Sequence, residues 1–349
     1  MPIARRIFLG SLLLLVALAG CDCEQRVRKL AKPSDEKRVA ARTEFAQIDQ
    51  LSEVEPNDGP RQATPIVIRN ELRPVHAEID SAQDIDWFSV TSEGEERVMV
   101  ELSVEPSDAA LNVAIYLEVP GALDVEPLLY DVARAGEIES IPILLIGPEP
   151  LRFFVAGVGG TVGKYTIQFR RRLSGGAIEA EPNDFAHTPT ALTIPGEIQG
   201  FYDRPRDRDI YHVGADQLKG EVYSLEITSI EGLTQSVNVY ADARLEQPLL
   251  SLSVTSRGPA SIPNFALPAE AQGLWFVLSA GEGYDRQRGY RLKILEHPAE
   301  TEFTLEREPN DTEANPQPVV LGEVLRGYLH DPTDVDRFRL TLEAAPASE

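Results

Sequence analysis

The chain has 349 residues, of which 33 are basic and 56 acidic, and its net charge is −23 with the histidines neutral. A surface this acidic repels nucleic acids and anionic lipid headgroups, and it favours cations and basic partners. The composition therefore argues against a nucleic-acid-binding protein.

The N-terminus has the layout of a cleavable export signal over residues 1–20. Two arginines precede an apolar run over residues 7–19, which is too short to span a bilayer comfortably. The run ends in Leu-Ala-Gly-Cys, which resembles the bacterial lipobox. This resemblance implies that Cys21 is lipidated and that the exported protein is anchored to a membrane of the cell envelope. Arg-Arg-Ile-Phe-Leu also resembles the twin-arginine motif, so the export route and the choice of inner or outer membrane stay open.

Cleavage before Cys21 leaves a charged tether over residues 21–52. The 33 basic residues fall to 31 against 56 acidic ones, a net charge of about −25. With Cys21 lipidated, Cys23 has no partner for an internal disulfide, so stability must come from hydrophobic cores or bound metal. Alternating charges and few large apolar residues are typical of a flexible linker, although residues 35–51 also fit a short helix.

The string Glu-x-Glu-Pro-Asn-Asp occurs three times, starting at Glu53, Glu179 and Glu306, and an Asp-x-Asp string follows each copy. The copies are about 126 residues apart, so the chain beyond the tether is built from repeats. Each Asp-x-Asp enters a segment with apolar residues at alternate positions, such as Phe88 and Val90. This period of two predicts a strand with one buried face.

About seven or eight short strands in each full copy, separated by Gly, Pro and Asp, predict an all-β fold. We expect tandem antiparallel β-sandwich domains of a jelly-roll-like kind, with repeat 1 over residues 53–172 and repeat 2 over residues 179–297. Repeat 3, over residues 306–349, has room for two or three strands, which cannot bury a core. Either this domain continues beyond the sequence, or it packs on repeat 2 or another chain and offers its sheet edges to a partner.

Each copy of the acidic string gathers carboxylate and amide oxygens, which are the ligands that calcium requires. Pro-Asn-Asp is a strong turn sequence, so an extended arm should enter a tight turn and meet the Asp-x-Asp loop. The candidate metal ligands are Glu53, Glu55, Asn57, Asp58, Asp80, Asp84 and Asp86 in repeat 1, Glu179, Glu181, Asn183, Asp184, Asp203, Asp207 and Asp209 in repeat 2, and Glu306, Glu308, Asn310, Asp311, Asp331, Asp334 and Asp336 in repeat 3.

Three features together resemble the bacterial pre-peptidase C-terminal domain: Glu-Pro-Asn-Asp, the segment Asp334-Val335-Asp336-Arg337-Phe338, and a closing strand with glycine and tyrosine. That family is a β-sandwich appended to exported proteins and is similar to the collagen-binding domains of clostridial collagenases. The resemblance covers nearly everything beyond the tether. It implies that the acidic arm and the aspartate loop supply calcium ligands.

Two alternatives to a metal stay open. Arg206 and Arg208 flank Asp207, and these cations can neutralise the loop of repeat 2 in place of a metal. Each acidic string can also be a solvated turn, in which asparagine and aspartate cap their own backbone and the glutamates are exposed.

The sequence lacks the strings His-Glu-x-x-His and Gly-x-Ser-x-Gly, and we expect no enzymatic activity. Trp87 and Ile210 occupy an outward strand position and are candidates for a binding surface, although packing under a loop is an equal alternative. We expect a cell-envelope lipoprotein whose calcium-stabilised domains bind protein or glycan non-covalently. The alternative is a structural spacer or an accessory subunit of an exported enzyme or envelope complex, without a ligand of its own.

Overall fold

The computed structural model describes residues 51–122, 125–172, 177–220, 222–255, 258–297, 303–330 and 334–341. The predicted signal peptide, the lipidation of Cys21, nearly all of the tether and the ligand Asp331 lie outside the described residues. In the described part, no helix is long and apolar enough to cross a membrane. This part is built from strands, apart from short 3₁₀ turns at Val158–Gly160 and Ala215–Gln217, so the all-β prediction is confirmed.

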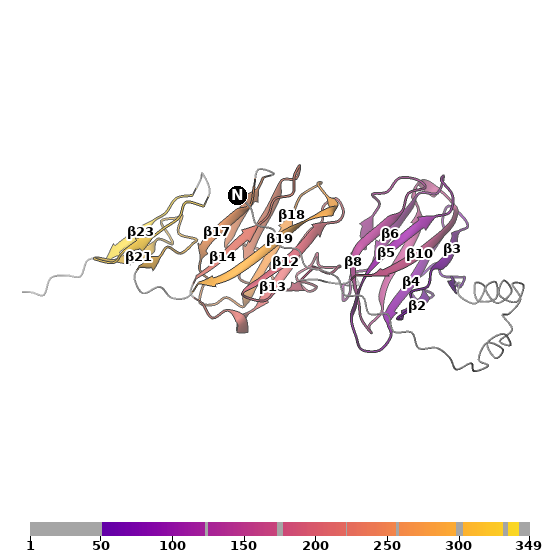
Figure 1. The fold of residues 1–349 in the computed structure, drawn as a ribbon, viewed down its shortest axis with the longest axis horizontal. Coiled ribbons are helices and arrows are strands. Elements are labelled where there is room, and N and C mark those ends of the chain that lie inside the picture. Colours follow the sequence, from indigo (N-terminus) through magenta and orange to yellow (C-terminus); the bar gives the residue numbers. More distant parts are fainter. Residues whose placement is uncertain are drawn as a thin grey trace, which may run out of the picture. The chain divides into compact units, whose positions relative to one another are not determined.

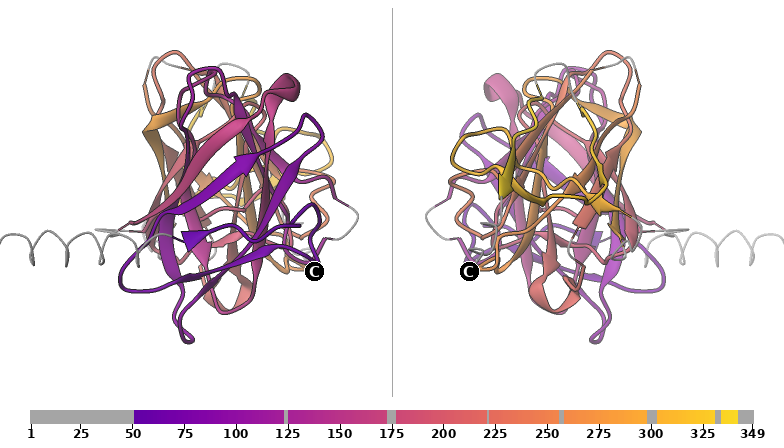
Figure 2. Two further views of the ribbon diagram at one scale, coloured as in Figure 1. Left: turned by 90° about the vertical axis from the view of Figure 1, so that its right-hand side faces the viewer. Right: turned by 90° about the vertical axis from the view of Figure 1, so that its left-hand side faces the viewer.

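Repeat 1 consists of two five-stranded sheets, drawn in indigo to magenta (Figures 1 and 2). One sheet has, in spatial order, β1 (Leu51–Ser52), β3 (Val75–Ile79), β10 (Gly163–Arg171), β5 (Val98–Pro106) and β8 (Glu139–Ile146). The other has β2 (Thr64–Ile68), β4 (Ile85–Ser92), β9 (Leu151–Gly157), β6 (Val113–Leu117) and β7 (Leu128–Tyr130).

Repeat 2 has the same order of neighbouring strands. One sheet has β12 (Gly196–Tyr202), β19 (Asp285–His297), β14 (Val222–Ile227) and β17 (Ala260–Phe265). The other has β11 (Thr190–Ala191), β13 (Arg208–Gly214), β18 (Gly273–Ser279), β15 (Gln235–Tyr240) and β16 (Leu250–Val254). Strand β12 therefore corresponds to β3, and β17 corresponds to β8, which forms an edge of its sheet.

The described part of repeat 3 has only the opening strands of each sheet. Strand β20 (Thr304–Leu305) pairs with β22 (Leu325–Arg326), and β21 (Gln317–Val320) pairs with β23 (Phe338–Thr341). These pairs correspond to β1 with β3 and to β2 with β4 in repeat 1.

One hydrophobic cluster in each full repeat draws on both of its sheets. The alternation read from the sequence produces this core, because side chains at alternate positions of β4 point to the same face. Phe88 and Val90 are accordingly 0% and 1% exposed. Their counterparts in repeat 3, Phe338 and Leu340, are 41% and 50% exposed. The strands described for repeat 3 thus do not cover its apolar face.

Candidate metal centre

In each repeat the acidic arm meets the Asp-x-Asp loop, as the sequence predicted. Both glutamates of the arm and the second aspartate of the loop bring one carboxylate oxygen each to within 4.8 Å of the other two. The groups are Glu53, Glu55 and Asp86; Glu179, Glu181 and Asp209; and Glu306, Glu308 and Asp336. Residues far apart in the sequence therefore form one oxygen cluster in each repeat.

Hydrogen bonds from the backbone hold the first glutamate of each arm in place. The donor is the backbone amide of Glu78 in β3, of Phe201 in β12 or of Tyr328 just after β22. The asparagine side-chain amide donates to the same carboxylate, from Asn57 to Glu53 at 3.2 Å, from Asn183 to Glu179 at 3.5 Å and from Asn310 to Glu306 at 2.8 Å. The same set of hydrogen bonds therefore orders the arm in each of the three repeats.

The second glutamate of each arm accepts a hydrogen bond from the backbone amide of the asparagine two residues later. The distances are 2.9 Å from Asn57 to Glu55, 3.2 Å from Asn183 to Glu181 and 2.9 Å from Asn310 to Glu308. The peptide bond that follows this glutamate is cis in all three repeats. The other carboxylate oxygen of each glutamate takes no part in the hydrogen bond to the asparagine amide.

The aspartate loop closes on itself through the first aspartate of Asp-x-Asp. This aspartate accepts a bond from the backbone amide four residues earlier, from Asp80 to Asp84 at 2.7 Å, from Asp203 to Asp207 at 2.6 Å and from His330 to Asp334 at 2.7 Å. The residue of repeat 3 that corresponds to Asp80 and Asp203 is therefore His330. Asp331, which the sequence offers as the third aspartate of this loop, lies outside the described residues.

Tyrosines from the closing strand complete the site, and the sequence reading did not include them. The hydroxyl of Tyr165 donates to Asp86 at 2.5 Å, and that of Tyr290 donates to Asp209 at 2.6 Å. Tyr211, on β13, adds a bond of 2.6 Å to Glu179. A glycine stands just before the closing-strand tyrosine in both full repeats, at Gly163 and Gly289, and this signal was visible in the sequence.

Several buried oxygens of these clusters have no hydrogen-bond partner among the described residues. They include Oδ1 of the second Asp-x-Asp aspartate in every repeat, on Asp86, Asp209 and Asp336. Others belong to Asn57, Glu181, Asn183, Asp184, Asp203, Glu308 and Asp334. A buried acceptor without a partner is costly, and a cation placed among these atoms would satisfy them.

Burial raises the pKa of most of these carboxyl groups, because the charged form is desolvated. It raises the pKa of Glu53 to about 7 and that of Asp86 to about 8. In repeat 2 it raises the pKa of Glu179 to about 8 and that of Asp203 to about 7. Such groups hold protons at neutral pH unless another positive charge replaces them.

The arms of repeats 2 and 3 are buried, whereas parts of the first arm are exposed. Glu181 is 3% and Glu308 is 1% exposed, but Glu55, Asp58 and Asp80 are exposed to solvent. The solvated-turn alternative is therefore wrong for repeats 2 and 3. This difference between the copies could not be predicted from the acidic strings, which are the same in all three.

The difference arises because each later arm pairs with an edge strand of the preceding repeat. The amide of Glu181 donates to the carbonyl of Ile143 in β8 at 2.9 Å, and the amide of Leu145 donates back to Glu181 at 3.4 Å. Glu308 pairs in the same way with Asn264 and Ala266, at 2.9 and 2.8 Å. Each later acidic cluster is thus part of the junction between two repeats.

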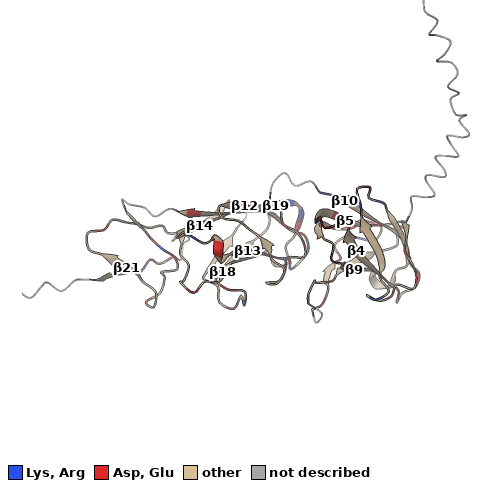
Figure 3. Cartoon of the chain, turned by 90° about the horizontal axis from the view of Figure 1, so that it is seen from below, with Lys and Arg blue, Asp and Glu red and all other residues tan. Residues whose placement is uncertain are grey.

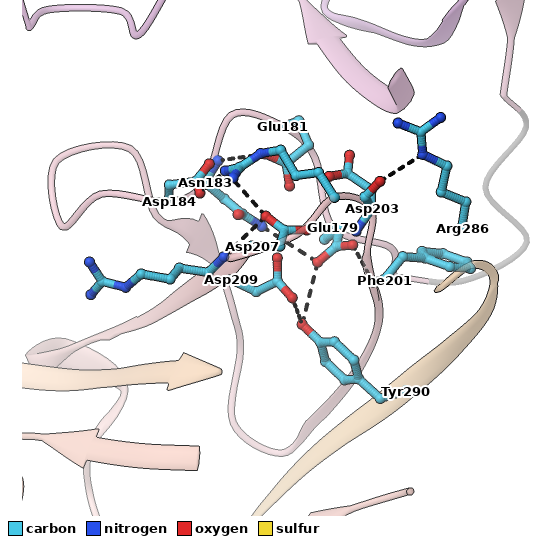
Figure 4. Close-up of polar contacts among 12 residues, drawn as sticks. Glu179, Glu181, Asn183, Asp184, Phe201, Asp203, Asp207, Asp209, Arg286 and Tyr290 are labelled. Carbon is cyan, nitrogen blue, oxygen red and sulfur yellow. Dashed lines mark hydrogen bonds and ion pairs between the residues drawn. The ribbon is translucent and has the colours of Figure 1, made fainter. Parts of the chain in front are cut away.

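Two arginines enclose the cluster of repeat 2. Arg204 forms buried ion pairs with Asp184 and, at 3.3 Å, with Asp207. Figure 4 shows Arg286 beside Asp203, to whose carbonyl it donates at 2.6 Å. Arg286 also pairs at 2.7 Å with Glu139 of repeat 1.

The alternative that Arg206 neutralises this loop is wrong, because Arg206 is exposed and pairs with Glu282. Arg208 does contribute: it donates its backbone amide to Asp207 at 3.0 Å, and its charge favours a lower pKa of Asp184. The larger contribution comes from Arg204, whose guanidinium reaches the buried aspartates.

The two candidate surface residues differ in exposure. Ile210 is fully buried, in a small cluster with Trp275 and Val277 against which Tyr240 and Leu245 pack, so it cannot offer a binding surface. Trp87 is half-buried on the outer face of its sheet. The structure therefore leaves Trp87 as a candidate and removes Ile210.

No protein-family model matches the chain, and no curated protein matches it. Among solved structures, the chain is similar to the N-terminal CBM22-1-CBM22-2 tandem domain of Xyn10C from Paenibacillus barcinonensis, at 10% sequence identity and a TM-score of 0.19. The match covers 60% of this chain and 82% of that chain. A TM-score this low carries no argument about function.

Proposed function

We propose that this chain is an exported, lipid-anchored protein of the cell envelope whose tandem β-sandwich domains belong to the pre-peptidase C-terminal type. Calcium bound at the acidic arms stabilises the domains, and the outer sheet faces bind a protein or a glycan without covalent chemistry. The observation that carries the metal is the set of buried, partnerless carboxylate oxygens, which recurs on Asp86, Asp209 and Asp336.

Calcium fits these clusters because it takes six to eight oxygen ligands and tolerates irregular geometry. In repeat 1 the residues that would hold it are Glu53, Glu55 and Asp86, with the amide oxygen of Asn57 as a further donor. Without an ion, protons neutralise Glu53 and Asp86, whose pKa values are raised. A bound ion would supply the positive charge in place of these protons.

An aromatic row on repeat 1 supports non-covalent binding. Trp87, Phe154 and Tyr116 lie side by side on neighbouring strands β4, β9 and β6. Their ring centroids are 4.7 Å and 4.4 Å apart, and all three side chains are half-buried. Half-exposed aromatic rings on a rigid sheet are typical anchors for a partner. Acidic residues, coloured red in Figure 3, outnumber basic ones by 56 to 33 in the sequence, and this excess favours a partner with basic groups.

The pairing of the arms with β8 and β17 favours the second candidate, a structural spacer. An arm that joins the edge strand of the preceding repeat fixes the junction through backbone hydrogen bonds, and calcium beside the same arm would strengthen it. A spacer needs these junctions and no ligand on the sheet faces.

Thermal unfolding of the full chain in excess calcium, and then in excess chelator, tests the metal. A ligand that binds only the folded state raises the unfolding midpoint, so we expect a higher midpoint with calcium. An unchanged midpoint would refute calcium binding. The variant Asp86→Asn should reduce the shift, whereas Asp242→Asn, at a half-buried aspartate that pairs with Arg244 outside the clusters, should not.

Binding to panels of matrix proteins and glycans separates the two candidate functions. Saturable binding that Trp87→Ala abolishes and Tyr284→Ala, at an exposed tyrosine of repeat 2, preserves would support a receptor. Absence of any ligand, together with co-purification of one stoichiometric partner, would support the accessory role.

A further inference from the structure

Repeat 3 carries a second group of ligand atoms that overlaps its acidic cluster. Glu308, His330 and Asp334 each offer one such atom, and the three atoms lie within 4.8 Å of one another. The group shares Glu308 with the all-oxygen group that also contains Glu306 and Asp336. Among the residues that the structure describes, repeats 1 and 2 have no second group of this kind.

The histidine stands where the other repeats have an aspartate. Its backbone amide donates to Oδ2 of Asp334 at 2.7 Å, as the amides of Asp80 and Asp203 do to the aspartates four residues later. The imidazole Nδ1 lies 2.7 Å from the same oxygen, and the side chains of His330 and Asp334 are only 8% and 0% exposed. Repeat 3 therefore has a candidate nitrogen ligand at the position where repeats 1 and 2 have a candidate oxygen ligand.

Two carboxylate oxygens of this group, Oε1 of Glu308 and Oδ1 of Asp334, are buried without a hydrogen-bond partner within the described part of the chain. Oxygens in that condition are costly unless a donor or a cation reaches them. A metal ion among the three side chains would contact both.

The nitrogen donor changes the class of ion that fits best. Calcium is held by oxygen ligands, whereas imidazole suits zinc and its neighbours in the transition series. Zinc accepts His, Asp and Glu together, and three protein ligands leave a position for water. We propose that Glu308, His330 and Asp334 bind a borderline divalent ion such as zinc. This step deepens the proposed function and rests on its claim that the acidic arms hold cations.

A calorimetric titration of zinc into the full chain, without calcium, tests this site. The variant His330→Asp restores the residue type of repeats 1 and 2, and His187→Asp changes an exposed histidine as a matched control. We expect His330→Asp to weaken one zinc site by at least about tenfold, and His187→Asp to leave it unchanged. Any zinc taken up by Cys21 or Cys23 is common to all three proteins and cancels in the comparison.

Nitrogen-15 spectra of histidine-labelled wild-type protein give a readout that needs no variant. Zinc coordination should shift a ring-nitrogen signal of His330, and an unshifted signal at saturating zinc would overturn the proposal. Equal zinc affinity of wild type and His330→Asp would overturn it too. If calcium does not raise the unfolding midpoint of the wild-type protein but zinc still binds, only the calcium sites are refuted.

Discussion

The hydroxyl of Tyr165 lies 2.5 Å from Oδ2 of Asp86, and both side chains are fully buried. The tyrosine is on β10, at the end of repeat 1, whereas the aspartate is the second residue of β4, in the other sheet. Tyr290 and Asp209 form the same pair in repeat 2. The closing strand thus anchors the acidic cluster, and a fold completed by that strand also completes the site.

We predict that Tyr165→Phe destabilises repeat 1 and weakens the calcium binding proposed for it. Removal of the hydroxyl leaves Oδ2 of Asp86 buried without its hydrogen-bond partner, which costs about 1–3 kcal/mol. Chemical denaturation should show this loss in chelator and part of it in calcium, because the ion compensates the charge.

The control for this prediction is Tyr284→Phe, which removes a hydroxyl from a tyrosine that is 41% exposed. We expect its free energy of unfolding to stay within about 0.5 kcal/mol of wild type. A similar loss in both variants would show that the Tyr165 hydroxyl has no special role.

The strands and the acidic clusters could be predicted from the sequence, because both depend on local pattern. Alternation fixes which face of β4 is buried, and the repeated string marks the residues that converge. Burial of Ile210 depends instead on Trp275 and Val277 of β18, with Tyr240 at the end of β15 and Leu245 beyond it packed against them. Side chains that pack onto a residue from distant segments cannot be recognised from the sequence around that residue.

The junctions were also beyond the reach of the sequence reading. Whether Arg204 or Arg206 turns inward depends on the path of the loop, and both stand beside acidic residues in the sequence. Pairing of Glu181 with β8 joins two repeats, and no periodicity within one repeat reports it. His330 escaped notice because an aspartate follows it directly.

We predict that Arg204→Met is strongly destabilising in chelator and less so in calcium. The change leaves Asp184 and Asp207 buried without their cation, and loss of one partner from a buried ion pair costs about 3–5 kcal/mol. Calcium should recover part of that loss, since a second cation can take over the charge. Denaturation with and without calcium measures both effects.

The matched substitution is Arg206→Met, whose guanidinium pairs with Glu282 on the surface. Exposed pairs contribute about 0–1 kcal/mol, so this variant should unfold nearly as wild type does. Equal destabilisation by the two substitutions would contradict the assignment of Arg204 as the internal cation.

We predict that Asn264→Ala loosens the junction between repeats 2 and 3. The Asn264 side-chain amide donates to the carbonyl of Glu306 at 3.0 Å and to its carboxylate at 3.2 Å. Without these bonds the arm should separate from β17 more often, and the Glu308 amide should exchange its hydrogen faster. Asn238→Ala, at a half-buried asparagine of β15, should leave that exchange unchanged. Unaltered exchange at Glu308 in Asn264→Ala would remove this residue from the junction.

We predict that the metal-free protein loses stability as the pH rises from about 4 to 8. Burial raises the pKa of Glu53 to about 7 and that of Asp86 to about 8, against about 4 in an unfolded chain. The folded state therefore binds more protons than the unfolded state across this range. Its stabilisation is complete below pH 4 and disappears as the pH passes 8.

Calcium should flatten or reverse this dependence, because it competes with the same protons and binds best when they have left. Unfolding midpoints at pH 5 and pH 8, each with chelator and with calcium, measure the effect. The double variant Glu53→Gln, Asp86→Asn should lose the part of the slope that comes from repeat 1. A chelated protein that is more stable at pH 8 than at pH 5 would mean that these carboxyl groups are ionised in the folded state without a metal, and the case for a cation at the arms would fail with it.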